Sequence, residues 1–161
     1  MAKLLIGEQA PDFALADSQG QTVELARLRG APVLLNFFKS DCSWCQVEMP
    51  KLADVYRRLA DLDLHVVGVA VGEESAQAEQ FAREKKLDFS VVADAGETGA
   101  AYGLERVPTL VLIDAAGIVA QIYEGSSEQL AGIVEQTMLA AVHGHELPDF
   151  SLVGNGCAPD A

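Results

Sequence analysis

Cysteine, positive charge and long apolar runs are all scarce in this sequence. Its 161 residues include three cysteines, Cys42, Cys45 and Cys157, which are too few for a disulfide framework in a chain of this length. Lysine and arginine total 11 against 24 aspartates and glutamates, and the net charge of −13 disfavours binding to nucleic-acid phosphates or anionic membrane surfaces. No apolar run approaches the roughly 20 residues that span a bilayer, so we expect no membrane insertion.

Length and hydrophobic content fit one folded domain, because half of the residues are hydrophobic and disordered chains contain far fewer. We predict a domain over residues 1–142 and a C-terminal tail over 143–161. The tail repeats the spacing of an opening segment, since the Gly, Pro, Asp, Phe and Leu of 7–15 recur over 144–152. It is therefore interpreted as a docking arm or as the start of a truncated second module. The first residues are too short for a secretory signal, so we expect a cytoplasmic protein, or a periplasmic one if a signal or anchor was removed.

Hydrophobic periodicity predicts strands that alternate with helices. The segment 7–15 is predicted to form a short strand or an extended arm, and the other ranges predicted as strands are 22–25, 32–38, 64–71, 89–92, 109–113 and 118–123. The ranges predicted as helices are 43–60, 73–86, 97–102 and 128–142, the last with Ser126 or Ser127 as its N-cap. This order predicts an α/β fold in which helices cover both faces of a mixed central β-sheet, with an N-terminal β-hairpin as an extension.

Two cysteines mark the junction between the strand 32–38 and the helix 43–60. Cys42 precedes the first turn of this helix, where unsatisfied backbone N–H groups and the helix dipole favour a thiolate. Cys45 follows one turn later on the same face and can reach back to form a disulfide. This placement predicts thiol–disulfide chemistry.

The Cys42-x-x-Cys45 motif after a buried strand, Val107-Pro108-Thr109 before another strand and the Gly7-x-x-Ala-Pro-Asp-Phe opening together resemble the thioredoxin-like superfamily. The closest similarity is to redoxins of the thiol–disulfide oxidoreductase and alkyl-hydroperoxide-reductase type. The resemblance implies a thioredoxin-like fold, no cofactor, and partners that are a disulfide-containing protein substrate and a dithiol electron donor. It also implies that Cys42 is the nucleophile and that Cys45 resolves the mixed disulfide.

Further roles follow from the same resemblance. Pro108 would form a cis peptide with Val107, and both residues would bind the substrate chain. Trp44 lies inside the motif, where relatives carry other residues, and is predicted to contact substrate. Glu48 follows Cys45 by three residues on the same helix face, and we expect it to accept the proton that Cys45 must lose.

Three alternatives stay open. A thiol peroxidase would use Cys42 as the peroxidatic cysteine, with Cys45 or Cys157 resolving, but Lys39 stands where peroxiredoxins carry threonine. A non-enzymatic redox-sensing module would use Cys157 for an intermolecular bond, although an incidental exposed thiol is the favoured interpretation of Cys157. A zinc site would need ligands from the tail, such as His143 or His145, and is disfavoured because no second C-x-x-C is present.

Overall fold

The computed structural model describes residues 3–150 and 152–159. The start of the predicted domain and the end of the predicted tail therefore lie outside the described residues. The helices are α1 Ser43–Arg58, α2 Ser75–Glu84, α3 Glu97–Ala101, α4 Leu130–Val142 and the 3₁₀ turn η1 Leu25–Leu28. The strands are β1 Ala14–Ala16, β2 Thr22–Glu24, β3 Val33–Phe38, β4 His65–Val71, β5 Ser90–Asp94, β6 Thr109–Ile113, β7 Val119–Glu124 and β8 Leu152–Val153.

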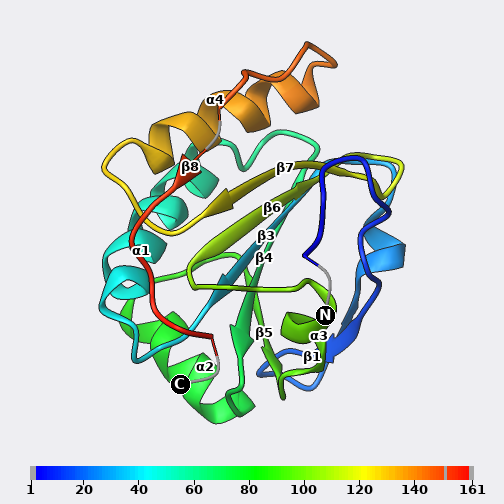
Figure 1. Ribbon diagram of the computed structural model, residues 1–161. Coiled ribbons are helices and arrows are strands. Elements are labelled where there is room, and N and C mark those ends of the chain that lie inside the picture. The colour runs from blue at the N-terminus through cyan, green and yellow to red at the C-terminus, as the bar shows by residue number, and fades with distance from the viewer. Residues whose placement is uncertain (1–2, 151, 160–161) are drawn as a thin grey trace.

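The central sheet has the strand order β5-β4-β3-β6-β7-β8 (Figure 1). Strands β5, β4 and β3 are parallel, whereas β6 is antiparallel to both β3 and β7. All residues of β3 and β6 are buried, which explains why their sequences show no alternation and are apolar except for Asn36 and Thr109. The mixed sheet predicted from the sequence is confirmed.

Helices cover both faces of this sheet. Neighbouring strand residues point to opposite faces. Phe38 stacks on Phe81 of α2, and Phe37 contacts Tyr102 at the end of α3, each pair with ring centroids 4.9 Å apart. Helices α2 and α3 therefore lie on opposite faces. Figure 1 shows α3 near the N-terminal hairpin β1–β2, away from α1 and α4, which pack together.

The tail adds an unpredicted strand to the sheet edge. Strand β8 pairs with the end of β7 in parallel, through Tyr123 with Leu152 and Glu124 with Val153. The opening segment binds the other end of the same strand, where the Gly7 N–H donates to the Val119 carbonyl at 2.8 Å. The two similar segments thus lie along one edge, at opposite ends of β7. In Figure 1 the red tail then descends past the start of α1.

One predicted helix start is wrong. Helix α4 begins at Leu130, its N-cap is Gln129, and no side chain caps it. Ser126 is buried and its hydroxyl donates to Glu48. The Ser126 hydroxyl binds the Glu48 carboxylate, which is distant in sequence, instead of capping the helix. Sequence spacing alone does not reveal this contact. Among the described residues, no helix is both long and apolar enough to cross a membrane.

Candidate active site

Cys42 lies where β3 ends and α1 begins, as the strand–helix junction predicts. It is the N-cap residue of α1, with extended backbone (φ −87°, ψ 119°), and its carbonyl accepts the first helical hydrogen bond from Gln46 N–H at 3.0 Å. The thiol position therefore faces the positive end of the helix dipole. Pro50 lies inside the same helix, two residues after Glu48.

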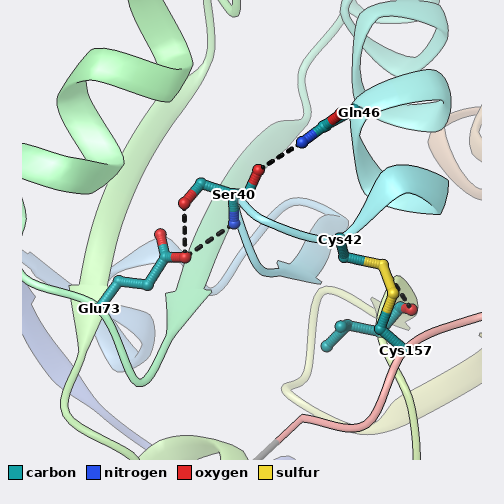
Figure 2. Close-up of a disulfide and its surroundings, with 6 residues drawn as sticks. Ser40, Cys42, Gln46, Glu73 and Cys157 are labelled. Carbon is teal, nitrogen blue, oxygen red and sulfur yellow. Dashed lines mark hydrogen bonds between the residues drawn. A yellow bond between two sulfur atoms is a disulfide. The ribbon is translucent and has the colours of Figure 1, made fainter. Parts of the chain in front are cut away.

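Cys42 forms a disulfide with Cys157 rather than with Cys45. The Cα atoms of Cys42 and Cys157 are 5.9 Å apart, and the residues are separated by 115 positions in the chain (Figure 2). Cys42 Sγ also lies 3.7 Å from the Val107 carbonyl oxygen. The interpretation of Cys157 as an incidental exposed thiol is wrong, because the tail folds back onto the C-x-x-C motif.

Cys45 is the free thiol, and it is fully buried. The pKa of the Cys45 thiol is raised to about 12. Burial is the largest cause, the negative charges of Glu73, Asp41 and Glu48 contribute to the increase, and a hydrogen bond with the Lys39 backbone opposes it. Cys45 is therefore protonated at neutral pH. It needs a proton acceptor before it can attack a disulfide.

Glu48 is a buried carboxylate in α1, one turn after Cys45. Its side chain is 0 % exposed, and its Oε1 accepts a hydrogen bond from the Ser126 hydroxyl at 2.6 Å. Its Oε2 has no hydrogen-bond partner among the described residues. A buried carboxylate that is held at one oxygen and free at the other suits a proton acceptor.

The Ser126 hydroxyl should stabilise the protein through this contact. We expect Ser126→Ala to lower the free energy of unfolding by about 1–3 kcal/mol, because a buried carboxylate oxygen loses its donor. Urea denaturation measures the change. Ser127→Ala is the matched control, since the Ser127 hydroxyl is also buried but has no partner among the described residues. Equal losses for both variants would contradict the assigned hydrogen bond.

The loop before Cys42 is held by polar side chains that the sequence analysis missed. Glu73 Oε2 accepts hydrogen bonds from the Ser40 backbone N–H and hydroxyl, both at 2.7 Å (Figure 2). The Gln46 side chain donates to the Ser40 carbonyl at 2.9 Å. Glu73 follows β4, which pairs in parallel with β3, so both strands end at the same side of the sheet and Glu73 lies near Ser40. The predicted parallel pairing was the one feature of the sequence that could have indicated this contact.

The predicted substrate-binding residues flank the disulfide. The Val107–Pro108 peptide bond is cis, as the resemblance implies, and both residues are buried. Trp44 in the first turn of α1 is 40 % exposed and Val47, one turn later, is 54 % exposed. Within the described residues, no group of three or more His, Cys, Asp or Glu could hold a metal ion.

The AhpC/TSA family model matches residues 6–122, which include the C-x-x-C motif and the Val-Pro-Thr segment. The chain belongs to the AhpC/TSA family. It is 32% identical over 137 residues to the thiol-disulfide oxidoreductase ResA of Bacillus anthracis, covering 83% of this chain and 79% of the relative. These matches identify an oxidoreductase that acts on thiols and disulfides.

Solved structures agree on the fold. A crystal structure of a hypothetical protein from Sinorhizobium meliloti matches with a TM-score of 0.87 at 18% identity, covering 98% of this chain and 94% of that chain. A secreted disulfide oxidoreductase from Mycobacterium tuberculosis matches with a TM-score of 0.66 at 25% identity, covering 74% and 92%. The thioredoxin-like fold expected from the sequence is confirmed.

Proposed function

We propose that the protein reduces disulfide bonds of protein substrates through a mixed disulfide. The Cys42 thiolate attacks one sulfur of the substrate disulfide and releases the other as a thiolate. Cys45 then attacks Cys42 Sγ, the Cys42–Cys45 disulfide forms, and the substrate leaves reduced. A dithiol donor restores both thiols. The observation that carries this proposal is the position of Cys42 at the α1 N-terminus, with a buried thiol one turn behind it.

The surroundings of Cys42 support a protein substrate. Trp44 and Val47 expose apolar surface next to the nucleophile, and exposed apolar surface favours contact with another protein. Val107 and Pro108 lie beside the reactive sulfur and offer backbone groups to an extended chain. Glu48 takes the proton from Cys45. Each role is consistent with the geometry of the site, and together they define the proposed mechanism.

Trapping tests the mixed disulfide. Cys45→Ser in a Cys157→Ser background should accumulate a covalent complex between Cys42 and a disulfide-bearing protein such as insulin, because no thiol remains to resolve it. Non-reducing electrophoresis and mass spectrometry of the adduct measure it. The Cys157→Ser single variant should turn over insulin with dithiothreitol as donor and accumulate no adduct. Absence of turnover in that variant with any dithiol would disprove the oxidoreductase proposal.

The Cys42–Cys157 disulfide also supports a second candidate, a thiol peroxidase. In that reaction the Cys42 thiolate attacks a peroxide oxygen and becomes a sulfenic acid while the second oxygen leaves as water or alcohol. Cys157 would then condense with the sulfenic acid, releasing water and leaving the observed bond. Lys39 stands in place of the peroxide-binding threonine and disfavours this candidate. Hydrogen peroxide consumption no faster than that of a free thiol would exclude it.

We propose that the protein acts outside the cytoplasm, the second of the two locations expected from the sequence. A disulfide between distant residues persists in oxidising compartments, and a solved relative is described as secreted. Cell fractionation with an antibody against the chain tests this location. Recovery in the cytosolic fraction alone would contradict it.

A further inference from the structure

Residues 152–157, here called the C-terminal arm, cover the nucleophile. Cys42 is only 2 % exposed although it occupies a helix N-terminus, because Cys157 is bonded to it. No substrate disulfide can approach Cys42 in this arrangement. The arm thus occupies the place that the proposed function assigns to substrate.

The arm binds through backbone pairing, as an extended peptide does. Cys157 and Val107 exchange both backbone hydrogen bonds, at 2.8 and 2.9 Å. Ser126 and Asn155 exchange two more, at 2.7 and 3.2 Å. Such reciprocal pairs are the antiparallel mode by which a peptide adds to an exposed backbone edge. Because these contacts are made by main-chain atoms, an external chain can make them too.

Glycine is required at two arm positions. A Cβ atom on Gly156 would lie 2.6 Å from the Val107 carbonyl oxygen, and one on Gly154 would lie 2.3 Å from the Ser126 carbonyl oxygen. Both obstacles are backbone atoms of the receiving edge, so they cannot turn away as a flexible side chain would. Neither glycine has a left-handed backbone, so close approach alone explains the requirement. The edge therefore selects glycine immediately before the cysteine.

We propose that the C-terminal arm is a tethered substrate, that Cys157 is a third redox-active thiol, and that the same edge accepts external disulfide-bearing peptides with glycine directly before cysteine. This inference rests on the proposed oxidoreductase function and specifies its substrate class.

The exchange within the chain needs no external oxidant. The Cys45 thiolate attacks Cys42 Sγ, the Cys42–Cys157 bond breaks and the Cys42–Cys45 bond forms. Cys157 leaves as a thiolate and takes up the proton that Cys45 lost. Both forms contain one disulfide and one thiol, so no electron is gained or lost. The arm competes with external peptides from a tethered position, where effective concentrations reach the millimolar range.

Disulfide mapping tests the internal exchange. We expect oxidised wild-type protein, denatured and alkylated at low pH and analysed by peptide mass spectrometry, to contain mainly the Cys42–Cys157 link with Cys45 alkylated. Gly156→Val should convert it mainly to the Cys42–Cys45 link with Cys157 alkylated. Ala158→Val is the matched control, because Ala158 is an exposed neighbour on the other side of Cys157. The same distribution in wild type and Gly156→Val would overturn the proposal.

Peptide reduction tests the specificity. In the Cys157→Ser variant no disulfide ties the arm to Cys42, so an external peptide competes with the arm for the edge only against its main-chain hydrogen bonds. The probes are Val-Gly-Asn-Gly-Cys-Ala and Val-Gly-Asn-Ala-Cys-Ala, each as a disulfide with nitrothiobenzoate. The glycine peptide should be reduced about tenfold faster or more, since a Cβ atom at the position of Gly156 would overlap the Val107 carbonyl oxygen. Equal rates, together with normal insulin reduction, would overturn the tethered-substrate proposal and leave the oxidoreductase function standing. Loss of insulin reduction as well would reject the function itself.

Discussion

Cys42→Ser is expected to lower protein-disulfide turnover by about 10³-fold or more, to the background rate of the donor dithiol. The serine hydroxyl stays protonated at neutral pH, and the helix N-terminus cannot make it a useful nucleophile toward sulfur. Cys45 cannot substitute for Cys42, because it is fully buried and its pKa is raised to about 12. Insulin reduction with dithiothreitol as donor measures the loss.

The control for this prediction removes the other end of the same disulfide. Cys157→Ser should turn over insulin faster than the wild type, because Cys42 is no longer bonded to the arm. Both variants lose the Cys42–Cys157 disulfide, but only Cys42→Ser loses the nucleophile. A loss of turnover in Cys42→Ser alone is therefore due to the missing nucleophile. A Cys42→Ser protein that keeps a tenth of the wild-type turnover would refute the assignment of Cys42 as the nucleophile.

Glu48→Gln is expected to slow the attack of Cys45 on Cys42 by about 10²-fold at pH 7, the lower end of what a general base contributes. Burial holds the pKa of Cys45 at about 12, so without a base the rate follows the small thiolate fraction and increases tenfold per pH unit. The substitution also removes a negative charge that raises the pKa of Cys45, which is a small effect in the opposite direction. Variant and wild type should therefore converge as the pH approaches 12.

Stopped-flow fluorescence measures this step, because Trp44 is the single tryptophan of the chain and lies between the two cysteines. The reaction is started from a mixed disulfide of Cys42 with glutathione, in a Cys157→Ser background. Glu128→Gln is the control, since Glu128 is an exposed carboxylate near the start of α4. Identical pH profiles for Glu48→Gln and wild type would remove Glu48 from the mechanism.

The sequence predicted the elements whose signals are local. The apolar runs of β3 and β4 have no alternation because both faces are buried, and their order with the intervening helix leads to parallel pairing. Cys42 and Cys45 could be placed at the start of α1 because the end of the strand and the start of the helix are both local features of the sequence. The resemblance to the family followed from short motifs, each formed by residues that are close together in the sequence. Helix ends were less accurate, as the false cap at Ser126 shows.

The contacts that set the state of the site could not be predicted in this way. Ser126 donates to Glu48, Glu73 fixes Ser40, and Cys157 bonds Cys42, over separations of 78, 33 and 115 residues. No periodicity or spacing encodes such pairs, because they depend on which strand ends meet at one edge.

The sequence by itself determined that a dithiol lies at the junction of a buried strand and a helix, because strand burial and helix capping are local properties of the chain. Only the tertiary structure decided which cysteine is bonded to Cys42. The outcome depends on the tail running along β7, where backbone hydrogen bonds and the absence of a Cβ at Gly154 and Gly156 bring Cys157 to the nucleophile. Main-chain pairing of this kind carries almost no signature in the sequence, apart from the two glycines themselves.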